Sequence, residues 1–281
     1  MAVSLVGVVN TYRYTNNLTN TGPGESLTLT SNTSFPFVAG DFGLVISGYP
    51  STTSGGLVGV TSPTATSVAN LYSNDTYDSN LNASWFFFTS SASFGVTYRT
   101  SGTNLLPSSI IIMLFRGVDP TTPLDVTPTT ATGINSQNFN PPAITPVSAN
   151  TTIVTAGMVA DNPTGTISTF PTGYTSIANT NLAGTTSWIL TSTTYKTLSG
   201  GAGVSQDPSN FTTTTTSTTA SWAAFTIALR PTTGRVKYAT GNTTALDNAF
   251  LPKPVKYWNG SSWVTKPAKY WNGSSWIKTP W

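Results

Sequence analysis

The segment Ile110-Ile-Ile-Met-Leu-Phe115 consists of six consecutive apolar residues and decides the class of fold. A short apolar run that is rich in β-branched residues is typical of a strand buried on both faces, in the centre of a sheet. The segment Trp85-Phe-Phe-Phe88 has the same character. We therefore expect both segments to be central strands.

Further strand candidates lie on both sides of these two runs, from Met1 to Pro231. They are bounded by Gly, Pro, Asn and Ser, and no segment has a convincing helical period. The candidates are Leu5–Val9, Ser26–Thr30, Phe42–Ser47, Trp85–Thr89, Gly95–Arg99, Ile153–Val159, Trp188–Leu190, Thr194–Leu198 and Trp222–Leu229, and Thr212–Thr216 is either an exposed strand or a loop. About ten strands separated by turns predict an all-β fold, an antiparallel β-sandwich or jelly-roll-like body.

The composition excludes most catalytic chemistry. The chain has 281 residues, no His and no Cys, and only 7% of its residues are charged, whereas Thr and Ser number 54 and 33. The chain therefore lacks thiol nucleophiles, disulfides, the imidazole base and the usual ligands of transition metals. We expect a protein that is not an enzyme and that needs no cofactor.

Carboxylates are the remaining candidates for catalysis or metal binding. Asp75 and Asp78 lie close together, and Asp119 and Asp125 flank a Pro-rich turn, so a pair for glycoside hydrolysis can be imagined. Asp before Pro, Ser or Thr more often fixes a turn, and we favour that interpretation. Calcium would need several oxygen ligands, and no loop is rich enough in Asp. We predict no catalytic, cofactor-binding or metal-binding residue.

Charge and tryptophan divide the chain into two parts. Residues 1–231 carry five basic and eight acidic residues, whereas residues 232–281 carry seven basic residues and one acidic residue. Five of the eight tryptophans also lie in the last 50 residues. We therefore expect a sandwich body at 1–231, a linker at 232–252 and a basic, Trp-rich repeat arm at 253–281.

The arm contains a repeat with a period of 13 residues. Lys256-Tyr-Trp-Asn-Gly-Ser-Ser-Trp263 recurs unchanged as Lys269-Tyr-Trp-Asn-Gly-Ser-Ser-Trp276. Asn-Gly between β-favouring aromatics is the strongest short signal for a two-residue hairpin turn. Each unit is therefore predicted to be a hairpin in which Trp258 pairs with Ser261, which places Lys256, Trp258 and Trp263 on one face.

Such an arm has two interpretations. A lone hairpin is marginal in water, so these units must stack on each other or dock elsewhere. The arm either folds over the body of its own chain or grips a partner with its aromatic residues, and we favour the partner because aromatics dominate interface hot spots. The predicted partner-binding residues are Lys256, Tyr257, Trp258, Trp263, Lys269, Tyr270, Trp271, Trp276 and Trp281. Single-stranded nucleic acid is disfavoured because the lysines are few and the body is acidic.

Several segments together carry a resemblance to known proteins. They are Gly40–Ile46, Ile110–Pro123, Thr151–Asp161, Pro171–Tyr174 and Ala220–Pro231. In this order they resemble β-sandwich proteins of tailed-phage virions, over most of residues 40–231. The Trp-Asn-Gly-Ser-Ser-Trp repeat is similar to short C-terminal repeats on phage tail and capsid-surface proteins.

The resemblance implies a non-enzymatic virion protein, either a decoration (cement) protein on the capsid or part of a tail or fibre. We favour decoration, because the sequence has no coiled coil, collagen-like stretch or β-helix repeat for a fibre shaft. The expected partners are other virion proteins, the major capsid protein or tail proteins, and further copies of the chain, with trimers common among such proteins. No nucleic acid or membrane partner is expected.

Two expectations concern location and an alternative function. The first ten residues lack a basic region and no apolar stretch approaches ~20 residues, so we expect synthesis in the host cytoplasm and a place on the virion surface. The alternative function is a tail or fibre adhesin that binds a host-surface carbohydrate. Tyr72, Tyr77 and Tyr174, expected in loops, could form a stacking platform for a sugar, although single aromatics more often pack at a core.

Overall fold

The computed structural model describes most of the chain. The described residues are 2–13, 25–50, 57–89, 93–100, 108–161, 165–183, 188–214, 219–232, 255–266, 269–271 and 275–278. Every helix or strand assigned in these ranges is a β-strand. The all-β prediction is therefore confirmed.

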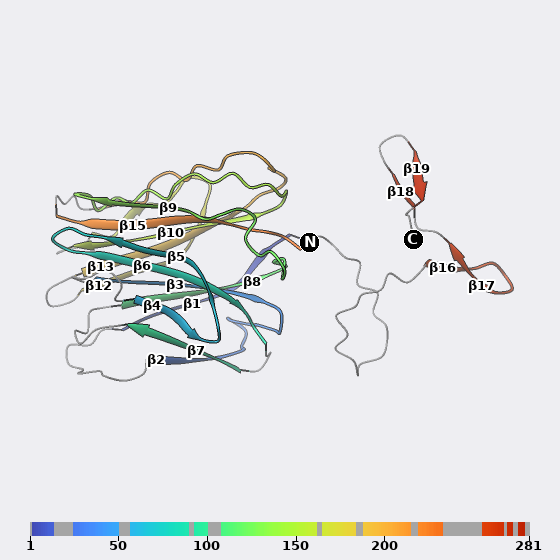
Figure 1. Cartoon of the computed structure of the whole chain (residues 1–281), viewed down its shortest axis with the longest axis horizontal. Coiled ribbons are helices and arrows are strands. Elements are labelled where there is room, and N and C mark those ends of the chain that lie inside the picture. The colour runs from blue at the N-terminus through green and yellow to red at the C-terminus, as the bar shows by residue number, and fades with distance from the viewer. Residues whose placement is uncertain are drawn as a thin grey trace. The chain divides into compact units, whose positions relative to one another are not determined.

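The strands of the body form antiparallel sheets (Figure 1). The first sheet has the order β1-β8-β3-β6-β5, with β1 Ser4–Arg13, β3 Phe42–Pro50, β5 Thr66–Ser73, β6 Ser79–Phe87 and β8 Ser108–Arg116. The second sheet has the order β12-β13-β10-β15-β9, with β9 Thr129–Ile134, β10 Thr152–Asp161, β12 Thr175–Ala183, β13 Trp188–Thr197 and β15 Ser221–Leu229. The outer sheet β2-β7-β4 has β2 Glu25–Thr30, β4 Leu57–Ser62 and β7 Ser93–Thr100, and β11 Ile167–Thr169 pairs with β14 Thr212–Thr213.

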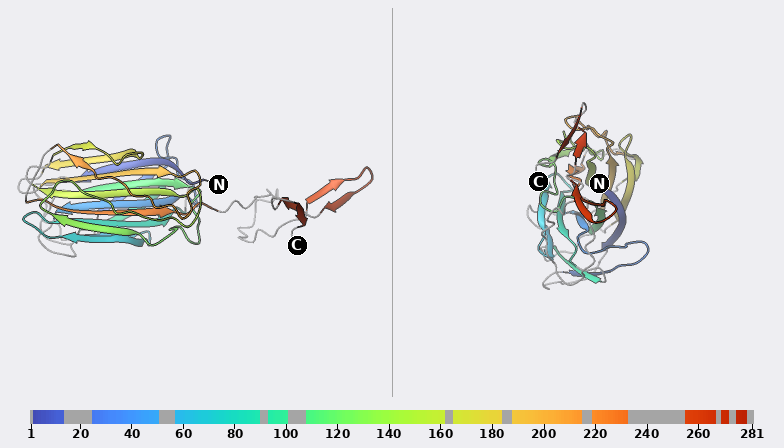
Figure 2. Two further views of the ribbon diagram at one scale, coloured as in Figure 1. Left: turned by 90° about the horizontal axis from the view of Figure 1, so that it is seen from above. Right: turned by 90° about the vertical axis from the view of Figure 1, so that its right-hand side faces the viewer.

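The first and second sheets pack face to face, and their strands run in similar directions (Figure 2). The apolar run of β8 shows how the core is built, because its side chains alternate between two clusters. Ile111, Met113 and Phe115 enter the core between the two sheets. Ile110, Ile112 and Leu114 enter a second cluster on the other face, together with Leu29 of β2. The prediction of a central strand buried on both faces is confirmed.

The segment Trp85–Phe88 follows the same pattern at the end of β6. Phe86 and Phe88 lie in the second cluster, whereas Trp85 and Phe87 are half-buried and pack against the core between the sheets. The indole of Trp85 stacks on Phe42 of β3, with ring centroids 5.6 Å apart. This segment is therefore also covered on both faces, as predicted.

Loops rather than a sheet cover most of the outer face of the second sheet. Phe139 and Phe211 stack with centroids 4.6 Å apart and lie in a cluster with Val159 and Leu190 of the sheet. An ideal Cβ at Gly157 would lie 2.3 Å from the Phe139 ring. Glycine at this position in β10 therefore lets the ring lie directly on the sheet.

The two sheets are copies of one topology. Strands β1, β3, β5, β6 and β8 follow each other in the chain as β9, β10, β12, β13 and β15 do, and each set has the same order in its sheet. The pairs β4·β7 and β11·β14 occupy the same places between these strands. The first sheet uses only residues before 117 and the second only residues after 128. The sandwich therefore consists of two consecutive, equivalent halves.

Local details support the equivalence of the halves. Thr66-Ser-Val-Ala-Asn70 in β5 matches Thr175-Ser-Ile-Ala-Asn179 in β12. The register shifts between Ser67 and Ala69 in β5, and between Ser176 and Ala178 in β12, which is the same position in both copies. Because bulges are specific features of a strand, this coincidence indicates an internal duplication.

Some strand predictions need correction. The two expected strands Trp188–Leu190 and Thr194–Leu198 are one strand, β13, because the polar residues between them are buried within the sheet. Strands β4, β5, β9, β11 and β12 were not predicted. Of the ambiguous segment Thr212–Thr216, the first two residues form β14, and Thr215 and Thr216 lie outside the described residues.

The chain divides into two units, Met1–Thr233 and Gly234–Trp281. The predicted linker, 232–252, lies outside the described residues except for Thr232. The second unit contains β16 Val255–Trp258, β17 Trp263–Lys266, β18 Lys269–Trp271 and β19 Trp276–Lys278. These form two separate two-stranded sheets, β16-β17 and β18-β19.

Candidate functional site

Both copies of the 13-residue repeat form β-hairpins. In the first, Trp258 lies opposite Trp263, Tyr257 opposite Val264 and Lys256 opposite Thr265. Alternation along the strands places positions 256, 258 and 263 on one face of the hairpin, as predicted.

The turn of the first hairpin has four residues, not two. The side-chain Oδ1 of Asn259 accepts hydrogen bonds from the backbone N–H of Ser261 at 2.9 Å and of Ser262 at 2.8 Å. The N–H of Asn259 donates to the carbonyl of Ser262 at 3.1 Å, and Gly260 has φ +100°. Asn259 thus caps the turn with its own side chain, and Gly260 supplies the left-handed backbone.

The predicted pairing of Trp258 with Ser261 is therefore wrong. The side-chain oxygen of Asn259 accepts hydrogen bonds from Ser261 and Ser262, which a two-residue turn would place in the second strand. Both serines therefore belong to the turn, and Trp258 pairs with Trp263 instead. The partner of Trp258 moves by two residues, from position 261 to position 263. Because side chains alternate with a period of two, each residue stays on the face that was predicted for it.

The second hairpin repeats the first. Trp271 lies opposite Trp276, Tyr270 opposite Ile277 and Lys269 opposite Lys278. Identical sequences 13 residues apart thus have identical register, with paired tryptophan positions beside each turn. The structure places eight of the nine predicted partner-binding residues in these hairpins, and Trp281 lies outside the described residues.

The carboxylates considered for catalysis are engaged in loop structure. Asp78 accepts hydrogen bonds from the Tyr72 hydroxyl at 2.8 Å and from the N–H of Asp75 at 3.0 Å. Asp119 accepts from the N–H groups of Thr121 and Thr122 at 2.8 and 3.0 Å. These contacts match the interpretation as turn chemistry. No cluster of three or more potential metal-binding residues occurs in the described ranges.

Two arginines at equivalent places in the halves hold aspartates. Arg116, at the end of β8, bonds to Asp41 at 2.7 and 2.9 Å. Arg230, which follows β15, bonds to the buried carboxylate of Asp125 at 3.0 Å. Burial alone would raise the pKa of Asp125, but hydrogen bonds from Ser148, Val147 and Arg230 outweigh it and lower the pKa. Both pairs therefore fix the end of the body where β8 and β15 finish.

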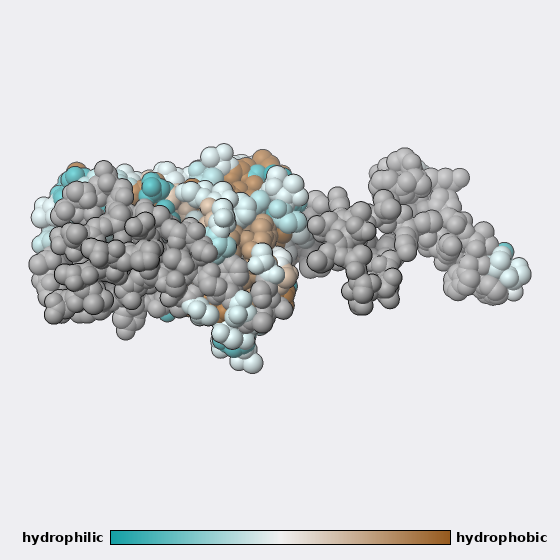
Figure 3. Space-filling model, turned by 60° about the horizontal axis from the view of Figure 1, so that its bottom comes forward, coloured by the Kyte–Doolittle hydropathy of each residue, from teal (hydrophilic) through white to brown (hydrophobic). Residues whose placement is uncertain are grey.

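One exposed valine lies beside each of these ion pairs. The described surface carries an apolar area towards one end of the body (Figure 3). Val38 donates its N–H to Asp41, and Val147 donates its N–H to Asp125, and both valine side chains are exposed.

The three tyrosines considered as a sugar platform lie in different surroundings. Tyr72 belongs to β5 rather than to a loop, and Tyr77 packs against the core between the sheets. Tyr174 is half-buried beneath Lys196, whose Nζ lies 5.6 Å from the ring centroid. Burial and the nearby charge of Asp207 raise the pKa of Tyr174 to about 12.

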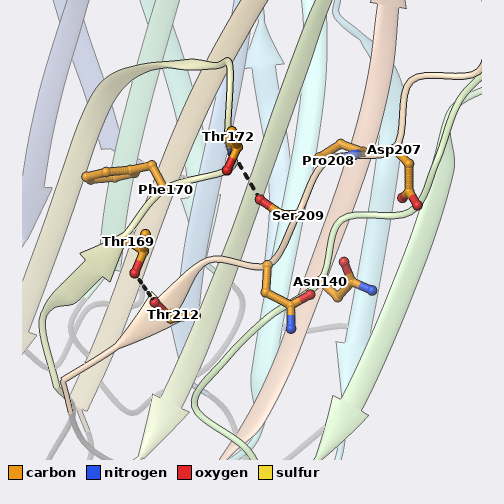
Figure 4. Close-up of a pocket in the computed structure, with 9 residues that line it drawn as sticks. Asn140, Thr169, Phe170, Thr172, Asp207, Pro208, Ser209 and Thr212 are labelled. Carbon is orange, nitrogen blue, oxygen red and sulfur yellow. Dashed lines mark hydrogen bonds between the residues drawn. The ribbon is translucent and has the colours of Figure 1, made fainter.

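A groove on the outer side of the second half was not predicted from the sequence. It has a volume of about 460 Å³ and is open to solvent. Its lining comes from three separate segments and consists of Asn140, Thr169, Phe170, Thr172, Asp207, Pro208, Ser209, Asn210 and Thr212 (Figure 4). Because these segments are distant in the sequence and share no motif, no sequence signal could have identified them as one site.

Comparisons with known proteins do not assign the chain to a family, since no family model, curated protein or solved structure matches it. In the described part of the chain, no helix is long and apolar enough to cross a membrane.

Proposed function

We propose that this protein is a non-enzymatic structural component of a tailed-phage virion, a capsid decoration protein attached through its C-terminal hairpin repeat. The observation that supports this role most directly is the repeat itself. Two hairpins with the same sequence have the same register, with paired tryptophan positions at each turn.

The size of the hairpins supports a docking role for the arm. Two-stranded hairpins are marginal in water on their own. Tryptophan and tyrosine are also the residues most enriched in interface hot spots. A partner that covers these residues would stabilise the hairpins and be held by them at the same time.

The repetition and the charge support multivalent attachment. Two linked binding units raise the overall affinity without any new kind of contact, provided both reach their sites. The seven basic residues after position 231 would add attraction to an acidic partner surface. A capsid presents many identical sites, so a repeated unit fits such a surface.

The proposal is tested by binding to undecorated particles of the source virus. The full-length chain is compared with a 1–252 truncation and with a variant in which Trp258, Trp263, Trp271 and Trp276 are changed to Ala. We expect regular binding over the head by the full chain and loss of binding by both variants. Imaging of the particles shows where the bound protein lies.

A matched control uses the other face of the same hairpins. Val264 and Ile277 occupy equivalent positions in the two units, opposite Tyr257 and Tyr270. The Val264→Ala/Ile277→Ala variant should bind much more strongly than the tryptophan variant. Normal incorporation of the tryptophan variant would disprove attachment through the arm, and binding at the tail alone would place the protein in the adhesin class.

A further inference from the structure

Phe170, the aromatic residue of the groove lining, packs against a buried pair of stacked phenylalanines. Phe139 and Phe211 stack at 4.6 Å with an interplanar angle of 22°, and Phe170 meets Phe211 edge-on at 6.1 Å. The backbones of Phe139 and Phe211 also exchange hydrogen bonds of 3.3 and 3.0 Å. Phe170 is half-buried, so part of its side chain stays accessible at the groove.

Hydrogen bonds between the segments fix the middle of the groove. The hydroxyl of Ser209 accepts from the N–H of Thr172 at 2.9 Å, and the hydroxyls of Thr212 and Thr169 are hydrogen-bonded to each other (Figure 4). Thr169 and Thr212 also lie opposite each other in the β11·β14 strand pair. The shape of the groove therefore exists before any ligand binds.

The rim of the groove carries polar groups that the fold does not use. Asn140, Asp207 and Asn210 are exposed, and their side chains make no hydrogen bond to any described residue. In the view of Figure 4, Asp207 and Asn140 are drawn to the right of Phe170. The rim thus offers one carboxylate acceptor and two amides that both donate and accept.

This combination selects a class of ligand. Vicinal hydroxyls of a sugar donate to carboxylate and amide oxygens and accept from amide N–H groups, while the C–H face of the ring packs on an aromatic side chain. The lining holds one negative charge and no Lys or Arg, which disfavours phosphate, sulfate and acidic sugars. A volume of about 460 Å³ is in the usual range for small-molecule sites.

We propose that this groove binds a neutral carbohydrate, with Asp207 and Asn140 holding the hydroxyls and Phe170 packing against the sugar ring. The site lies in the body and is independent of the arm, so it goes beyond the proposed attachment function. A decoration protein with such a site would display a glycan-binding surface on the particle.

The test uses the full-length chain and neutral oligosaccharide probes. Saturation-transfer NMR with maltotetraose, mannotetraose, galactobiose and chitotriose detects weak binding, and titration gives the dissociation constant. We expect saturable binding of at least one probe. Asp207→Asn and Asn140→Ala should each weaken that binding about tenfold or more, the effect of losing about 1.4 kcal/mol.

Control variants separate the groove from other causes. Asn179→Ala changes an exposed residue of β12 outside the groove and should bind as the wild type does. Phe170→Leu keeps an apolar side chain on Phe211 and should weaken binding while the protein stays folded. The 1–252 truncation should bind the probe normally, even if it no longer binds particles.

Two results would overturn the inference. One is the absence of saturable binding to all four probes. The other is binding that survives Asp207→Asn and Asn140→Ala but is lost when the four arm tryptophans become Ala, which would move the sugar site to the arm.

Discussion

At the scale of single residues, buried hydroxyl groups join the two main sheets. The hydroxyl of Ser109 in β8 donates to the hydroxyl of Thr191 in β13 at 2.7 Å, and both residues are fully buried. A buried polar group that loses its partner costs about 1–3 kcal/mol, whereas removing both partners can be nearly neutral. The many hydroxyl side chains of this chain are thus part of its core as well as of its surface.

We expect Thr191→Val to lower the free energy of unfolding by about 1–3 kcal/mol, because the Ser109 hydroxyl then has no acceptor there. The double variant Ser109→Ala/Thr191→Val should regain part of this loss. Urea unfolding followed by tryptophan fluorescence measures both. Strictly additive losses in the double variant would show that the two hydroxyls do not act as a pair.

Asn259 is the residue that sets the register of the first hairpin. Its side-chain oxygen accepts hydrogen bonds from Ser261 and Ser262. Asn259→Ala removes these bonds, so we expect faster hydrogen–deuterium exchange across 255–266 while the body is unchanged. Ser262→Ala is the control, because Ser262 bonds to Asn259 through its backbone N–H and carbonyl, which the substitution keeps. Equal exchange in both variants would contradict a capping role for the side chain.

At the scale of elements, the apolar strand β8 was predictable and the mostly polar strand β5 was not. All six residues of Ile110–Phe115 are apolar and all six are buried. The composition of this segment alone therefore identifies a central strand. Strand β5 lies at the edge of its sheet and has mixed burial, and its residues Thr66-Ser-Val-Ala-Asn70 show no alternation. Such a strand forms because β6 offers hydrogen-bond partners, and pattern analysis cannot detect that tertiary effect.

The hairpin register shows a second limit of sequence rules. Asn-Gly favours a two-residue turn on average, yet the two serines that follow offer N–H groups to the Asn259 side chain. The local competition between two kinds of turn is decided by these hydrogen bonds. The faces were still predicted correctly because the register differs by an even number.

The segment between β8 and β9 is held by the pair Arg230 and Asp125. Since the folded pKa of Asp125 is below its ordinary value of 3.8, its ionised form stabilises the fold above that pH. This contribution is lost as the pH falls through the lowered pKa. We therefore expect Asp125→Asn to be less stable than the wild type at pH 7, with a difference that shrinks below about pH 4.

Urea unfolding of both proteins at pH 7, 5, 4 and 3 measures this difference. The other carboxylates titrate in both proteins, so their effect on the free energy of unfolding cancels in the difference between wild type and variant. A difference that stays constant down to pH 3 would show that the Asp125 charge contributes nothing.

At the scale of the whole molecule, the duplication organises the body, and the sequence alone did not reveal it. The two halves share strand order, a bulge position and an arginine at the end of β8 and after β15, but few identical residues. Topology depends on burial and pairing, which many sequences can satisfy. The groove has the same explanation, because its lining is brought together only when the second half folds.

The duplication makes a prediction about the connection between the halves. Each main sheet uses residues from one half only, and the two bury a common core that includes Phe42, Phe115, Phe225 and Leu229. A protease site inserted at Thr121–Thr122, whose N–H groups both bond to Asp119 in an exposed turn, can be cut without breaking a strand. We expect the cut halves to stay together on gel filtration, because separation would expose that core to water. The cut halves should separate only in denaturant. The denaturant concentration needed should be lower than the one that unfolds the uncut chain, because the halves are no longer covalently linked. Separation in buffer alone would mean that the covalent link, rather than the packed faces, holds the sandwich together.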